Sequence, residues 1–146
     1  MIKIIAVGRL KEPHYQQAEA EYYKRLRKIE VLEIKESSDK NPEVAIKKEA
    51  REIQSKISAS SDQQIIALEA SGKQVSSEEF AKLIAKKQDT TFLIGGPYGH
   101  TQDTLKKADY VLSLSQMTFP HQLARVILAE QIYRAHTIQA GKEYHK

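Results

Sequence analysis

Short apolar runs alternate with amphipathic segments along the chain, and this alternation is the feature that most restricts its fold. The first run, Ile2–Val7, is rich in β-branched residues and is closed by Gly8, as expected of a strand buried on both faces. Further strands are predicted at 29–35, 65–69, 90–94 and 110–115, and helices at 13–27, 43–58, 78–87, 103–108 and 120–139. Strands and helices at this spacing form a mostly parallel sheet with helices on both faces. We therefore predict a single α/β domain over residues 1–146.

Composition excludes several kinds of site. The chain has no cysteine and only 5 scattered histidines, which excludes disulfides and thiolate sites and makes us expect no metal. No apolar run is long enough to cross a bilayer, and no basic leader precedes Ile2, so we expect a cytoplasmic protein without a membrane partner. The 23 basic and 19 acidic side chains leave a small positive excess, so an acidic partner would contact a folded patch and not a basic tail.

Two loops follow predicted strands at the sheet edge where open α/β proteins bind ligands. Gly95–Gly99 follows the fourth strand and Leu114–His121 follows the fifth. The first loop matches neither a Walker loop nor a dinucleotide fingerprint, so bound phosphate is not expected there. A tight turn that requires glycine is an equal alternative for this loop. For the second loop, the alternative to ligand binding is that Ser115 or Thr118 caps the last helix.

Basic residues gather in two places near the start of the chain. One pair follows the first strand, and a denser group ends the first predicted helix, where Lys24 and Lys28 would share a face. For the second group, a solvated helix end is an interpretation equal to an RNA contact. The candidate RNA-binding residues in these two places are Arg9, Lys11, Lys24, Arg25, Arg27 and Lys28.

The end of the chain carries two further signals. Apolar residues surround most of the last predicted helix, from Leu123 to Ala135, and a helix of this kind must be covered. We predict that a second copy of the chain covers it, although a central position against the sheet is the alternative. Terminal residues Tyr144, His145 and Lys146 can stack on a base, move a proton and hold a phosphate. A frayed terminus without function is the simpler interpretation of this tail.

Six motifs that are weak one by one together resemble a known family. The motifs are Val7–Glu12, Leu68–Lys73, Ile94–Gly99, Met117–Gln122, Glu130–Ala135 and Tyr144–Lys146. They occur in this order over the whole chain, and together they resemble the bacterial ribosomal RNA large subunit methyltransferase H family of the SPOUT superfamily.

The resemblance implies an α/β knot at the carboxyl-terminal side of the fold, a homodimer and the cofactor S-adenosylmethionine. It also implies N3 methylation of a pseudouridine in 23S ribosomal RNA of the assembled ribosome. The cofactor site that it implies consists of Leu68, Gly95, Leu114, Ser115, Gln116, Met117, Thr118 and Phe119.

The same resemblance gives the tail a role in catalysis. His145 would be the general base, Tyr144 would stack on or orient the target base, and Lys146 would hold phosphate. The tail of one protomer would complete the site of the other. The chain is shorter than is usual in the family, chiefly between Glu36 and Gln64. Two alternatives remain open: a non-catalytic RNA-binding module of the same fold, and a methyltransferase for another RNA such as transfer RNA. DNA is not an expected partner.

Overall fold

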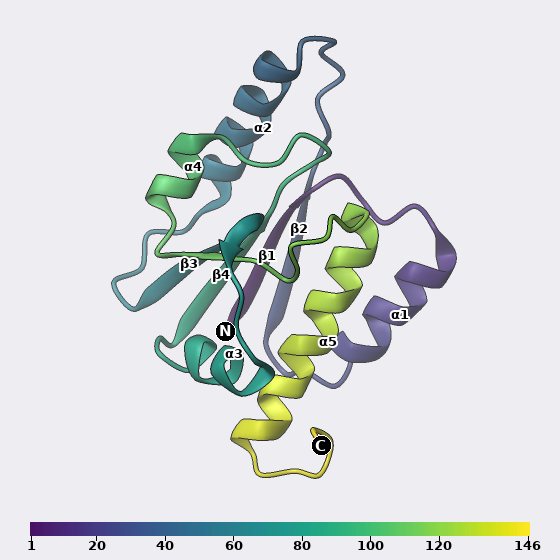
Figure 1. Cartoon of the computed structure of the whole chain (residues 1–146), viewed down its shortest axis with the longest axis vertical. Coiled ribbons are helices and arrows are strands. Elements are labelled where there is room, and N and C mark those ends of the chain that lie inside the picture. Colours follow the sequence, from purple (N-terminus) through teal and green to yellow (C-terminus); the bar gives the residue numbers. More distant parts are fainter.

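The computed structural model describes residues 1–146 as one α/β unit (Figure 1). None of its helices is both long and apolar enough to cross a membrane. The strands are β1 (Ile2–Val7), β2 (Ile29–Ile34), β3 (Gln63–Lys73), β4 (Asp89–Ile94) and β5 (Tyr110–Leu112). The helices are α1 (Pro13–Tyr23), α2 (Pro42–Lys56), α3 (Ser77–Ile84), α4 (Gln102–Lys107) and α5 (His121–Gln139).

All five strands run parallel in the order β2-β1-β4-β3-β5. Leu68 of β3 lies level with Ile94 of β4 and Leu112 of β5. The segments that follow these three residues therefore lie side by side at the carboxyl edge of the sheet. The prediction of a parallel α/β sheet is confirmed.

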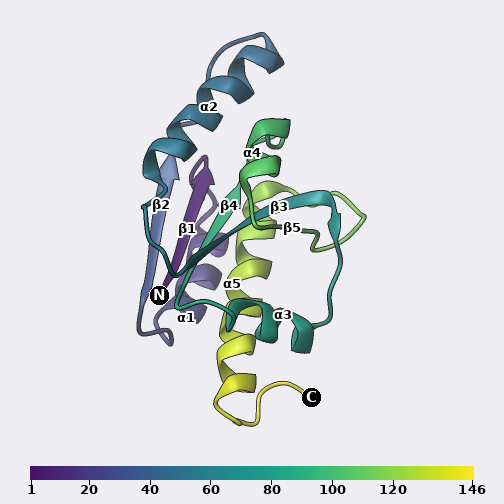
Figure 2. The same cartoon turned by 90° about the vertical axis from the view of Figure 1, so that its left-hand side faces the viewer.

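Helices cover both faces of the sheet, as predicted (Figure 2). On one face, α3 and α5 bury side chains such as Phe80 and Leu128 against Ile4 and Phe92 of the sheet. On the other face, Ile53 of α2 packs with residues of β1, β2 and β4. The central strands are thus apolar on both sides, which explains their nearly continuous runs of buried residues.

Local signals set the helix ends, and two sequence predictions are wrong here. Ser76 is the N-cap of α3, so this helix begins at Ser77 and not at the predicted residue 78 with Ser77 as its cap. The Ser76 hydroxyl accepts from the Glu79 amide, and the Glu79 carboxylate accepts from the Ser76 amide. Helix α1 ends at Tyr23, before the predicted end at residue 27. Lys24 and Lys28 therefore do not share a helical face, because the chain after Tyr23 turns back toward β2.

Strand β3 is longer than its apolar run predicts. The run ends near Glu69, but the extended backbone continues to Lys73, and the pairing with β5 shifts register between Leu68 and Lys73. At Gly72 the backbones come so close that a Cβ atom would lie 2.6 Å from the carbonyl oxygen of Val111. Only glycine fits at this crossing.

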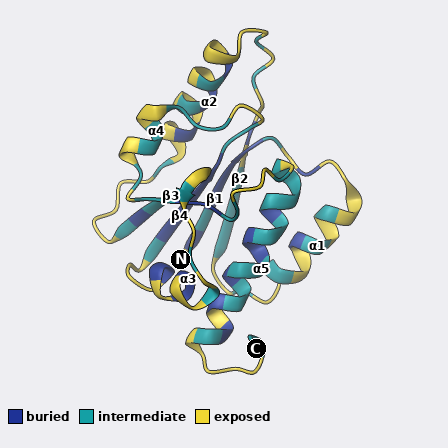
Figure 3. Cartoon of the chain, in the orientation of Figure 1, coloured by how far each residue is buried: buried dark blue, intermediate teal, exposed yellow.

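Helix α5 lies between α1 and α3 on one face of the sheet (Figures 1 and 3). Leu128, Ala129, Ile132 and Ala135 are fully buried in the single chain. This central position accounts for a large part of the apolar surface of the helix. Its outward residues, from Leu123 to Arg134, remain only partly covered, so the predicted second copy stays a prediction.

A buried ion pair joins α5 to α1 and β2. The Arg125 guanidinium donates to both carboxylate oxygens of Glu19, at 3.0 and 2.9 Å, and to Glu33 at 2.9 Å. Only 2% of the Arg125 side chain is exposed. Burial raises the pKa of Glu19, and Arg125 opposes this shift. An arginine that interrupts an apolar helix therefore fixes where that helix lies.

We expect Arg125→Met to destabilise the protein by about 3–5 kcal/mol, because the Glu19 carboxylate would stay buried without its partner. Urea unfolding measures this loss. The double variant Glu19→Leu/Arg125→Met should recover most of the stability, whereas Glu33→Gln, at a half-exposed carboxylate, should cost less than about 1 kcal/mol. Equal stability of Arg125→Met and the parent would contradict this role.

Candidate active site

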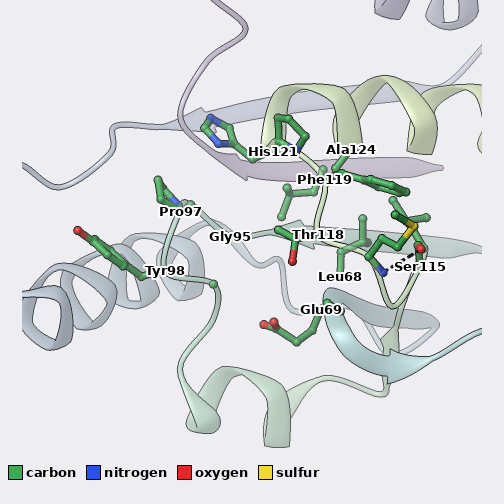
Figure 4. A pocket seen from close by; sticks show the side chains of 17 residues that line it. Leu68, Glu69, Gly95, Pro97, Tyr98, Ser115, Thr118, Phe119, His121 and Ala124 are labelled. Atoms are coloured by element: carbon green, nitrogen blue, oxygen red, sulfur yellow. Dashed lines mark hydrogen bonds between the residues drawn. The ribbon is translucent and has the colours of Figure 1, made fainter.

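The three loops at the carboxyl edge enclose one cavity of about 700 Å³ (Figure 4). Its walls come from the end of β3, from the loop after β4, and from the segment between β5 and α5. The first turn of α5 closes it with His121 and Ala124. A cavity of this size takes a ligand as large as a nucleoside with a side chain attached.

Nearly all the predicted cofactor-binding residues meet in this cavity. Gln116 is exposed and does not line it. Those that line it are Leu68, Gly95, Leu114, Ser115, Met117, Thr118 and Phe119. The structure thus brings together residues from three separate parts of the chain.

The segment Leu114–Phe119 offers free main-chain groups to the cavity. It makes no hydrogen bond with another main-chain group. The predicted alternative, a helix cap, is wrong: the N-cap of α5 is Pro120 and no side chain caps the helix. Ser115 Oγ instead accepts from the Met117 amide at 3.0 Å, within the loop. The amides and carbonyls of the segment that remain unpaired can recognise the polar edges of a ligand.

The Gly95–Gly99 loop is both a tight turn and a cavity wall. The Gly99 amide donates to the Gly96 carbonyl at 3.0 Å, and Gly99 has a φ of 77°, which favours glycine. A Cβ on Gly95 would lie 2.9 Å from the Gly99 carbonyl, so the loop itself needs glycine there. Behind the loop, burial raises the pKa of Glu49, while a hydrogen bond from the Ser37 amide opposes the shift.

The cavity carries negative charge and no basic side chain other than an imidazole. Glu69 is its only acidic residue, His121 is its only histidine, and neither lysine nor arginine lines it. Glu69 was not predicted, although a carboxylate at the end of the apolar run of this strand was a signal for it. Two exposed apolar side chains, Tyr98 and Met117, stand at its rim with 58% and 74% of their surface accessible, as expected where a partner binds.

His100 does not line this cavity, whereas His121 does. The His100 ring donates from Nε2 to the Leu93 carbonyl at 3.2 Å, and its amide donates to Glu69 at 3.4 Å. Burial lowers the pKa of His100. This residue anchors the turn after Gly99.

The predicted RNA-binding residues lie at two opposite edges. The Lys11 amide donates to Gln122 at the start of α5, which places Arg9 and Lys11 beside the cavity. The other four are Lys24, Arg25, Arg27 and Lys28. They lie at the amino edge of the sheet, where the Lys28 carbonyl accepts a hydrogen bond from the Ile2 amide. Three of these four line a second cavity of about 660 Å³, together with Lys87 and Lys142 and without any acidic side chain; they are Arg25, Arg27 and Lys28.

The tail is docked on its own chain, at a distance from the cavity. The Tyr144 hydroxyl donates to Glu130, and His145 accepts at Nδ1 from Arg134 and donates from Nε2 to Glu78 at 2.7 Å. This bond lowers the pKa of Glu78. Arg134 is about 15 Å of helix away from Ala124 in the cavity wall. One chain therefore does not bring its tail to its own cavity, and in this position both ring nitrogens of His145 are occupied.

Comparisons with known proteins agree with this geometry. A family model described as a predicted SPOUT methyltransferase matches residues 1–145. The chain belongs to this family. It is 44% identical to a ribosomal RNA large subunit methyltransferase H from Carboxydothermus hydrogenoformans, over 99% of each chain. It is 43% identical to the protein of the same name from Caldicellulosiruptor saccharolyticus, over the full length of both.

A solved structure supports the fold independently. A probable methylase family protein from Haemophilus influenzae superposes with a TM-score of 0.57 at 15% identity. The match covers 96% of this chain, which spans 66% of that protein's length. At this identity the likeness concerns the fold alone. The parallel α/β sheet of this SPOUT family member is consistent with its family assignment.

Proposed function

We propose that this protein methylates N3 of a pseudouridine in 23S ribosomal RNA of the assembled ribosome, with S-adenosylmethionine as methyl donor. The observation that carries the proposal is the single cavity that the three strand-end loops form, in a chain 44% identical to a ribosomal RNA large subunit methyltransferase H. We propose further that it acts as a cytoplasmic homodimer with a knotted carboxyl-terminal part. The close approach of the β3 and β5 backbones at Gly72 is compatible with such a knot.

The residues of the cavity fit S-adenosylmethionine. This cofactor has no phosphate, and the cavity has no lysine or arginine to bind one. Leu68, Phe119 and Ala124 form an apolar side that suits a flat adenine ring, and the free main-chain groups of Leu114–Phe119 can bind its polar edge. The positively charged sulfonium is compatible with the carboxylate of Glu69.

The chemistry needs positioning and the removal of one proton. S-adenosylmethionine supplies an electrophilic methyl group on a positively charged sulfur. The pseudouridine N3 must lose its proton to a base and then lie in line with the methyl carbon. The rim residue Tyr98, with its exposed ring, can stack on a base at the mouth of the cavity.

We propose that a second copy supplies the tail. His145 would take the N3 proton, Tyr144 would orient the base and Lys146 would hold phosphate. The separation of this tail from the cavity of its own chain supports a site shared by two chains. His145 must then leave Arg134 and Glu78, because its bound ring has no free acceptor.

RNA docking would use the two basic edges. Arg9 and Lys11 lie beside the cavity, whereas Lys24 and Arg25 are paired with Glu21 at 2.7 and 3.5 Å. The other two predicted RNA-binding residues at the amino edge, Arg27 and Lys28, make no ion pair. They would contact RNA further from the reacting base.

Replacing Arg9 and Lys11 by glutamate should weaken ribosome binding and reduce its salt dependence, because fewer phosphates would be neutralised. Binding measured at several salt concentrations tests this. Cofactor affinity should stay unchanged, and the control Lys106→Glu, on the exposed side of α4, should bind ribosomes like the parent. An unchanged salt dependence would contradict the docking role.

Calorimetric titration with S-adenosylmethionine tests the cofactor directly. We expect saturable binding by the parent chain and no measurable binding by Gly95→Val, because a side chain there meets the Gly99 backbone at 2.9 Å. The unfolding midpoint of the variant shows whether it remains folded. A folded parent protein that binds no S-adenosylmethionine would contradict the proposed function.

A further inference from the structure

We propose that Glu69 makes the cavity prefer the positively charged methyl donor to the neutral product. This inference rests on the proposed function, since it takes S-adenosylmethionine as the ligand. Loss of the methyl group turns the sulfonium into a thioether, so S-adenosylhomocysteine lacks one positive charge at sulfur. A carboxylate that faces the sulfur stabilises the donor and does not stabilise the product in this way.

The charge of Glu69 is not neutralised within the chain. It is the only acidic residue that lines the cavity, which has neither lysine nor arginine. Glu69 forms no ion pair. Its side chain is half-buried, so solvent screens it less than it would screen a surface carboxylate. A half-buried carboxylate without a cation favours a cationic ligand.

The fold also holds this carboxylate in one place. Glu69 follows Leu68, the last residue of β3 in register with β4. One carboxylate oxygen accepts from the His100 amide at 3.4 Å, and a Cβ on Gly99 would lie 3.2 Å from the same oxygen. Glycine at position 99 therefore leaves room for the carboxylate. The other oxygen has no hydrogen-bond partner in the chain and is free for a ligand.

The carboxylate of Glu69 lies apart from the apolar part of the cavity lining. Figure 4 shows its carboxylate on the side of Thr118 and the Gly95–Gly99 loop, away from the apolar group of Phe119 and Ala124. If adenine lies in that apolar part, the sulfur lies toward the carboxylate. The same side leads to Tyr98 at the rim, where the RNA base would enter. A preference for the charged donor here also helps release of the product after each turnover.

The test compares three ligands by calorimetry: S-adenosylmethionine, S-adenosylhomocysteine and sinefungin, in which a carbon replaces the sulfur and a protonated amine replaces its methyl group. In Glu69→Gln we expect the affinities for S-adenosylmethionine and sinefungin to fall roughly 10- to 100-fold, the usual effect of losing a charged partner. The affinity for S-adenosylhomocysteine should change less than about twofold. Glu69→Asp, which keeps the charge, should keep most of the preference.

The matched control is Glu52→Gln, which removes an exposed carboxylate on α2 and should leave all three affinities unchanged. An equal loss for donor and product in Glu69→Gln would overturn the inference, because it would place Glu69 on a group that both ligands share, such as the ribose or the amino acid. An unchanged ratio would overturn it as well. Failure of the parent chain to bind any of the three would instead overturn the proposed function, and this inference with it.

Discussion

The guanidinium of Arg125 is the interaction on which the arrangement of the site depends. It joins α5 to α1 through Glu19 and to β2 through Glu33. The first turn of α5 closes the cavity, and its second half holds the tail. One buried ion pair thus sets the position of both parts of the proposed site.

The cavity combines apolar side chains with main-chain groups of the loops. Gly95 allows the close approach of the Gly99 backbone, and the segment before α5 makes no hydrogen bond with another main-chain group. Such a site needs few specific side chains, which explains why no phosphate-binding or dinucleotide motif occurs in the sequence. Because the rest of the lining is mostly neutral, the charge of Glu69 dominates the electrostatics of the cavity. The proposed preference for a cationic ligand rests both on the absence of lysine and arginine from the lining and on the presence of Glu69.

Periodicity and loop position were sufficient to predict the α/β class and to place Gly95 and Leu114–Phe119 at the ligand edge. Local signals predicted helix ends less well, because adjacent serines at 76 and 77 compete as caps and only the Glu79 carboxylate selects between them. Long-range features were not predictable. Arg125 and Glu19 are 106 positions apart, and the continuation of β3 past Glu69 depends on its contact with β5. The positions of the basic residues at two edges likewise follow from the topology.

Transfer of a labelled methyl group to ribosomes that lack the modification tests the central claim most directly. We expect the parent protein, with S-adenosylmethionine, to add one methyl group per large subunit, at N3 of a pseudouridine. Gly95→Val and His145→Ala should each be inactive, and co-expression of the two should restore part of the activity if one chain supplies the cavity and the other the tail. No transfer by the folded, cofactor-bound parent protein would contradict the account.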